Sequence, residues 1–296
     1  MHRFMRAIGF SKLTERKQQK KLVTDIIVNP DDREYTTKQN DTVITMFSKE
    51  FAPGLGISVC GEFDEDDNYS YDYFYPYLRG NVISSSEDVS IERHAEKESY
   101  AGICDDVKVG ISLIFYLQNM ISYIRIKNQE LLPVRGTTLS LSGLSVQGMI
   151  VLPIEKDDRD RRRIRRQSAA RAKWMNAART GDEEAIEHLT TEDMDTYTAL
   201  SNMIQNEKTD ILSLVDTYFM PYGVECDHYS IMGEILEVEQ VTNEMTKEKI
   251  WKMTLLCNDI ALDICINALD LYGEPAVGRR FRGVIWLQGY INYPFQ

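Results

Sequence analysis

The segment Ile260-Ala-Leu-Asp-Ile-Cys-Ile-Asn267 decides the fold of the second half of the chain, because its apolar residues occupy alternate positions. Side chains two residues apart lie on the same face of a β-strand, so this segment predicts a strand with one apolar face. Further predicted strands lie at 229–241, 249–256 and 282–293, with polar turns between them. Short strands in this arrangement predict a small, all-β, barrel-like domain over residues 209–296.

The first part of the chain mixes helix and strand patterns. An apolar stripe predicts a helix over 14–28, and alternation predicts antiparallel strands over 42–47, 57–63 and 69–78. Apolar residues at helical spacing predict a buried helix from about 107 to 124, and 137–154 is typical of a β-hairpin. We therefore predict an α+β fold with a mixed domain over residues 1–156 that contains an antiparallel sheet.

The composition changes sharply after residue 156. Residues 159–179 hold nine arginines and lysines against a single aspartate, are rich in alanine and lack glycine and proline. This pattern predicts a charged helical connector over residues 157–208 between the two domains.

The overall composition excludes several classes of protein. The 296 residues are 43% hydrophobic and 27% charged, which is typical of globular proteins rather than of disordered or fibrous chains. There is no apolar run long enough to cross a membrane and no secretory signal pattern, and the five cysteines form no CxxC pair. We expect a cytoplasmic protein with reduced thiols that does not enter the membrane.

A tyrosine-rich strand is one candidate binding surface. Four tyrosines fall on alternate positions, which places them on one face of a strand: Tyr69, Tyr71, Tyr73 and Tyr75. Tyrosine combines a large apolar area with a polar tip and is common in recognition surfaces. Alternating burial in a sheet core explains the same pattern, so both interpretations stay open.

The basic connector is a second candidate. Its arginines, with Arg162, Arg163 and Arg166 at the centre, could bind phosphates while Trp174 stacks on bases. The net charge of −12 argues against nucleic acid in general, and the arginines could instead pair with acidic surfaces of the same protein.

The last predicted strand supplies a third candidate. Arg280, Arg282 and Trp286 combine basic and aromatic side chains, which small barrels use to bind single strands or peptides. The alternative is that Trp286 belongs to the core and that the arginines fix a turn near Glu274.

The sequence supports a catalytic role less strongly than it supports a binding role. His94 and Glu98 would share a helix face, with Asp105 and Asp106 nearby, so a metal-dependent hydrolase around His94 is one alternative. A single histidine among scattered carboxylates is also typical of an exposed acidic loop, and Cys104 is typical of a buried thiol. The sequence contains no GxxxxGK[ST], GxGxxG or GxSxG motif, so we expect no cofactor, no resident metal and no catalytic residue.

Four segments resemble an uncharacterised bacterial family, known only as a domain of unknown function and found mainly in anaerobic Gram-positive bacteria. They are Met1–Phe10, Arg93–Asp106, Ile114–Asn119 and Gly278–Gly289. The resemblance spans nearly the whole chain and implies a bacterial cytoplasmic protein, without an activity that could be transferred to particular residues.

These observations favour a non-enzymatic cytoplasmic binding or adaptor protein with a protein partner. The first alternative is a nucleic-acid-binding protein that uses the connector and the barrel, and the second is the hydrolase around His94. The sequence leaves the oligomeric state open.

Overall fold

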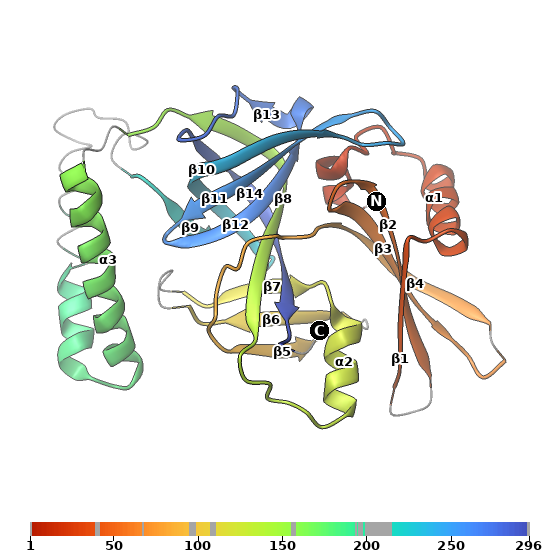
Figure 1. The fold of residues 1–296 in the computed structure, drawn as a ribbon, viewed down its shortest axis with the longest axis horizontal. Helices are drawn as coiled ribbons and strands as arrows, with labels where there is room; N and C mark the ends of the chain where they lie inside the picture. The colour runs from red at the N-terminus through yellow and green to blue at the C-terminus, as the bar shows by residue number, and fades with distance from the viewer. Residues whose placement is uncertain are drawn as a thin grey trace.

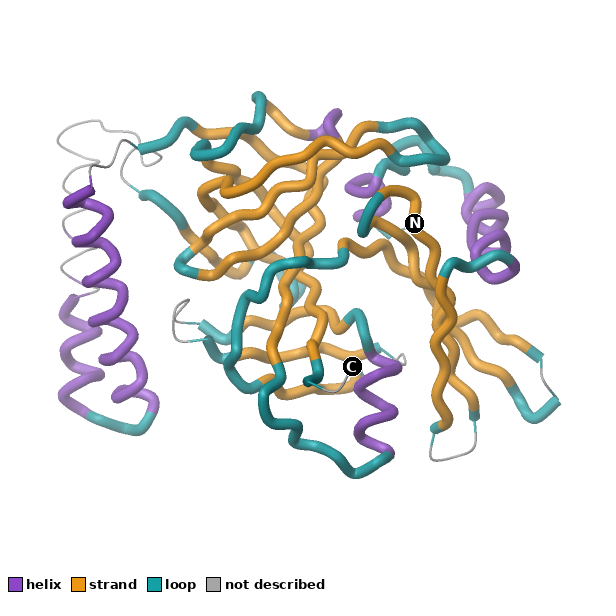
Figure 2. Tube along the Cα trace, in the orientation of Figure 1, coloured by secondary structure: helices purple, strands orange, loops and turns teal. Residues whose placement is uncertain are grey.

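The computed structural model describes residues 2–38, 42–66, 68–94, 99–106, 111–154, 158–192, 194, 198 and 215–294. The chain folds as α+β, with a closed barrel, a separate antiparallel sheet and a helical hairpin beside the barrel (Figures 1 and 2). None of the helices in these ranges has the length and hydropathy that a membrane crossing requires.

Five strands close the barrel, and they are β8 (Thr138–Val151), β10 (His228–Thr242), β11 (Lys249–Cys257), β12 (Ile260–Asn267) and β14 (Arg280–Asn292). The ring closes because β14 pairs with both β10 and β8, while β12 pairs with β8 in parallel. Alternate residues such as Leu255, Ile264 and Phe281 are fully buried. The alternation of the sequence therefore directs these side chains into the barrel interior.

Further strands extend this sheet on both sides. On one side β14 pairs in parallel with β7, and β6 and β5 follow as antiparallel neighbours. On the other side β13 pairs with β8. The bounds are β5 (Val89–Arg93), β6 (Tyr100–Cys104), β7 (Leu113–Leu117), β9 (Tyr218–Pro221) and β13 (Leu271–Tyr272). Strand β9 pairs with β10, and a 3-10 helix, η2 (Ala268–Asp270), leads from β12 into β13.

The second sheet is antiparallel, in the order β1, β2, β3, β4. Its strands are β1 (Asp32–Thr37), β2 (Val43–Ala52), β3 (Leu55–Phe63) and β4 (Tyr69–Leu78). Helix α1 (Arg16–Val28) contacts β2 and β3, and helix α2 (Met120–Asn128) contacts β1 and β2. Both helices thus cover apolar faces of this sheet that would otherwise be exposed to water.

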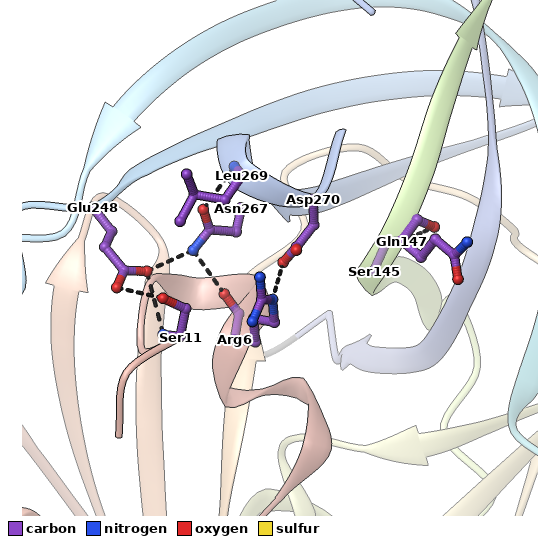
Figure 3. Close-up of polar contacts among 8 residues, drawn as sticks. All are labelled: Arg6, Ser11, Ser145, Gln147, Glu248, Asn267, Leu269 and Asp270. Atoms are coloured by element: carbon purple, nitrogen blue, oxygen red, sulfur yellow. Dashed lines mark hydrogen bonds and ion pairs between the residues drawn. The ribbon is translucent and has the colours of Figure 1, made fainter. Parts of the chain in front are cut away.

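The N-terminal 3-10 helix η1 (Arg3–Ile8) is fixed to the barrel by polar contacts. Figure 3 shows Glu248 and Asn267 facing this segment: Glu248 accepts hydrogen bonds from Ser11 and Asn267, and Asn267 Nδ2 donates to the Arg6 carbonyl at 3.2 Å. Arg6 also forms an ion pair with Asp270. These contacts place the first residues of the chain against the C-terminal half, so one buried apolar cluster joins the two sheets.

Two predicted elements differ from the structure. Residues 113–117, expected in a helix, form strand β7, and helix α2 begins only at Met120. Leu-Ile-Phe-Tyr-Leu is compatible with either element, and pairing with β6 and β14 decides for the strand. The expected hairpin over 137–154 is the single strand β8, which contributes to the barrel although it lies within residues 1–156.

A helical arm leaves the barrel between β8 and β9. We use this name for α3 (Asp158–Arg179) and the helical run 183–192 that returns beside it (Figure 2). Trp174 stacks on His188 with ring centroids 4.4 Å apart, and Arg171 forms a 3.0 Å ion pair with Glu192. Asp182 begins the second helix by accepting a hydrogen bond from the Ala185 amide. These contacts hold the two helices together as a hairpin.

Candidate functional site

The tyrosines of β4 do not share one exposed surface. Tyr71 is exposed, Tyr69 is partly buried, and Tyr73 and Tyr75 are buried in the core. Tyr75 donates a hydrogen bond to the Gln118 carbonyl at 3.1 Å, and burial raises the pKa of its hydroxyl well above the ordinary value. Only the first part of the strand, around Tyr71, is open to a partner.

The basic residues of the arm are divided among several roles. Arg163 and Arg166 have exposed side chains, while Arg162 lies outside the described side chains. Trp174 is engaged in the stack on His188, so its ring faces the second helix of the arm. At the end of α3, Arg179 donates a hydrogen bond to the Asp105 carbonyl at 2.6 Å, which connects the arm to the loop after β6.

Arg280 is buried and fastens the two ends of the arm to the barrel. Its guanidinium donates to the carbonyls of Leu152, at 2.8 and 3.0 Å, and of Val215, at 2.8 Å. Leu152 precedes the arm and Val215 follows it, so one side chain holds both connections. Burial lowers the pKa of Arg280. The hydrogen bonds to these carbonyls replace those that the guanidinium would make with water.

Trp286 is also buried, with its side chain among aromatic neighbours. Its indole N–H donates to Asp227 at 2.6 Å, and its ring lies against His2, Phe4 and Tyr116. Arg282, four residues earlier on the same strand, is exposed. The structure therefore separates the three predicted barrel residues, and only Arg282 reaches the surface.

Arg282 lies in a groove on the outer face of the barrel, with a volume of about 670 Å³. We call it the barrel groove. Its floor comes from the paired strands β8 and β14, and its sides come from the residues after β9 and from η2 and β13. The lining residues are Gln147, Gly148, Met149, Tyr222, Ser230, Leu269, Asp270, Leu271, Tyr272, Arg282, Gly283 and Val284.

The groove exposes apolar surface around a single positive charge. Leu269 and Tyr272 are 68% and 81% exposed, and Tyr222 on the opposite side is 50% exposed. The Arg282 Nε donates to the Tyr218 hydroxyl at 3.1 Å, and no carboxylate of the described residues lies within ion-pair distance of it. The carboxylate that lines the groove, Asp270, is already paired with Arg6 (Figure 3). The groove thus has a positive centre in a chain of net charge −12.

The residues proposed for metal chemistry lie apart or outside the described residues. His94 is exposed and lies 2.8 Å from the Ser99 hydroxyl, whereas Asp106 is buried and accepts a hydrogen bond from Ser85 at 2.6 Å. Glu98 lies outside the described residues, and those described contain no group of three His, Cys, Asp or Glu placed to hold a metal ion. Burial raises the pKa of the Cys104 thiol to about 11, which disfavours the nucleophilic thiolate.

The sequence pointed to Arg282 but not to the residues around it. Tyr222 follows a short strand, and Leu269 and Tyr272 lie where the chain turns after β12. Nothing in their local pattern signals a site, because only the pairing of β13 with β8 and of β9 with β10 brings them to the same face. All five cysteines are free in the structure.

The fold defines a class of protein, an α+β chain with a closed five-stranded barrel and a helical arm inserted between two barrel strands. The chain belongs to the family described as "Domain of unknown function, E. rectale Gene description (DUF3881)", whose model matches residues 5–289. This match confirms the family resemblance seen in the sequence. No curated protein and no solved structure matches the chain.

Proposed function

We propose that this protein is a non-enzymatic binding or adaptor protein that docks a segment of a partner protein in the barrel groove. The observation that carries the proposal is the exposure of Tyr222, Leu269 and Tyr272 around Arg282, which has no carboxylate partner among the described residues. Exposed apolar surface next to polar groups is typical of protein interaction sites. Tyrosine and arginine are among the residue types that contribute most to binding energy at interfaces.

The charge of the groove indicates the occupant. A segment with one acidic side chain beside aliphatic or aromatic residues would pair its carboxylate with Arg282 and cover the exposed tyrosines. A buried arginine–carboxylate contact between two molecules sets orientation and excludes partners with a basic residue at the same place. We therefore propose an acidic, apolar peptide segment as the ligand.

The Arg282→Glu variant is expected to bind such segments at least tenfold more weakly, which corresponds to about 1.4 kcal/mol. The reversed charge repels the acidic side chain instead of pairing with it. A library of displayed random peptides is selected on the wild-type protein, and the enriched peptides are measured by fluorescence anisotropy with both proteins.

Arg33→Glu is the matched control, because Arg33 is an exposed arginine on β1, which contributes no residue to the groove. Peptides in which the acidic residue becomes lysine should regain affinity for Arg282→Glu. The proposal is rejected if the selected peptides lack acidic residues or bind both Arg282→Glu and Arg33→Glu as tightly as the wild type.

Nucleic-acid binding is a second candidate, supported by one feature of the arm. Arg159, Arg163 and Arg166 are exposed at positions i, i+4 and i+7, which lie on one face of a helix and could follow a phosphate backbone. The second helix of the arm argues against nucleic-acid binding, because its acidic residues place negative charge beside α3. One of them, Glu192, already pairs with Arg171.

The triple variant Arg159→Ala, Arg163→Ala and Arg166→Ala tests this candidate. If the arm binds nucleic acid, affinity for a single-stranded RNA oligonucleotide should fall with rising salt in the wild type, and the slope against log salt should decrease by about 2 in the triple variant. An absence of binding at low salt would reject this function without affecting the peptide groove.

A further inference from the structure

A second concave site lies on the other side of the barrel, where the end of β4 meets the outer face of β10, β11 and β12. Its volume is about 290 Å³. This is the room of roughly ten water molecules and lies at the lower end of ligand pockets. We call it the polar pocket, and its polar lining includes Arg79, Asn81, Glu237, Glu239, Lys252 and Asp263.

Strand register explains how these side chains meet. Thr254 on β11 is the register partner of both Glu237 on β10 and Asp263 on β12. Two residues along, Glu239 on β10 is the register partner of Lys252 on β11. Residues two apart on each strand share a face, so carboxylates, a hydroxyl and an ammonium group alternate on the outside of the barrel. The chain that leaves β4 passes over this face and supplies Arg79 and Asn81.

Part of the pocket is already internally paired. Lys252 forms a 2.6 Å ion pair with Glu239. Asp263 is buried and accepts hydrogen bonds from the Thr254 hydroxyl and the Asn81 amide, both at 2.6 Å, and from the Val82 amide at 3.4 Å. These contacts satisfy both charges of the ion pair and both oxygens of the buried carboxylate, and they fix the walls of the pocket.

The two remaining charged side chains have opposite signs and come from different walls. Arg79 has its guanidinium 6.0 Å from the centre of the Tyr290 ring, and Glu237 projects from β10. Within the described residues, neither lies within ion-pair distance of an opposite charge. Arg79 and Glu237 thus line the same small volume with opposite charges.

We propose that the polar pocket binds a small zwitterion of the amino-acid class, with its carboxylate on Arg79 and its ammonium group on Glu237. A ligand with both charges would pair with both side chains at once. A purely anionic or purely cationic ligand would leave one of them without a partner and would meet the like charge of Glu237 or Arg79. The pocket volume fits one small metabolite and is too small for a nucleotide or a peptide segment. This inference does not depend on the barrel groove.

An ω-amino acid series tests the inference, because its members carry the same two charges at increasing separation. Glycine, β-alanine, γ-aminobutyrate and 5-aminovalerate are titrated into the full chain together with the common L-α-amino acids. Binding is followed by saturation-transfer NMR and calorimetry. We expect a maximum of affinity at one charge separation, and at least a tenfold loss for the amide and for the N-acetyl derivative of the best ligand.

Two variants assign the contacts, and one variant serves as control. Arg79→Met and Glu237→Gln should each weaken binding at least tenfold while leaving thermal stability close to that of the wild type, because both side chains are exposed. Arg282→Met removes an arginine from the barrel groove and should leave zwitterion binding unchanged. The inference is overturned if no zwitterion binds at millimolar concentration, or if binding survives in both pocket variants. Peptide binding to the groove is measured separately, so the two proposals can fail independently.

Discussion

The Phe281→Ala variant is expected to lose about 3–5 kcal/mol of the free energy of unfolding, the range for removing a fully buried phenylalanine side chain. Phe281 is fully buried in the barrel, and its ring lies against two glycines that are register partners on β8 and β14. A Cβ atom at Gly148 would lie 2.4 Å from the ring, and one at Gly283 would lie 2.6 Å from it. Chemical denaturation followed by circular dichroism measures the loss.

A double-mutant cycle separates this packing from a general effect of the substitution. Gly148→Ala alone should destabilise the protein by about 1–3 kcal/mol, because the new methyl group collides with the ring. In the Phe281→Ala background the same methyl group enters the space left by the ring and should cost little or nothing. Additive losses in the double variant would show that Phe281 and Gly148 do not share this space.

The second large effect is expected at Arg280, where Arg280→Met should reduce stability by about 2–4 kcal/mol. Methionine keeps much of the apolar stem but leaves the carbonyls of Leu152 and Val215 without their charged donor. The ends of the helical arm would then be released from the barrel. Limited proteolysis should show faster cleavage between residues 152 and 215, and denaturation should show the loss of stability.

Arg279 provides the matched control for this experiment. It is the adjacent arginine, and its guanidinium donates to the Glu274 carbonyl at an exposed site. Arg279→Met should stay within about 0.5 kcal/mol of the wild type, as expected for surface substitutions. Equal stability and equal cleavage of the two variants would contradict the assignment of Arg280 as the residue that anchors the arm.

Much of the secondary structure could be predicted because its signals are local. The predicted strands at 249–256 and 260–267 agree with β11 and β12, and the tyrosine strand 69–78 has the bounds of β4. The helix at 14–28 corresponds to α1. In each case alternation or helical spacing of apolar residues was sufficient, since both patterns follow from backbone geometry over a few residues.

The prediction around residue 115 was wrong for a physical reason. Leu113 and Leu117 are compatible with a helical stripe, yet the ring of Phe115 packs against Gly102 on β6 and Gly289 on β14. A Cβ atom at either glycine would lie within 2.4 Å of that ring. These partners are far apart in sequence from one another, so local periodicity gave no information about the pairing that fixes β7 as a strand.

The candidate sites also depend partly on local sequence and partly on contacts between distant segments. Arginine and tyrosine could be singled out as residue types suited to binding, and the sequence by itself determined the alternation that directs Arg282 outward and Phe281 inward. Only the tertiary structure decided that Arg280 is buried with its guanidinium on the carbonyls of Leu152 and Val215, that Tyr222 and Tyr272 line the barrel groove, and that Arg79 and Glu237 line the same pocket. The reason is that the direction of a side chain depends on its own strand, whereas its neighbours depend on pairing between strands far apart in sequence, as between Tyr116 on β7 and Gln288 on β14, which are 172 residues apart.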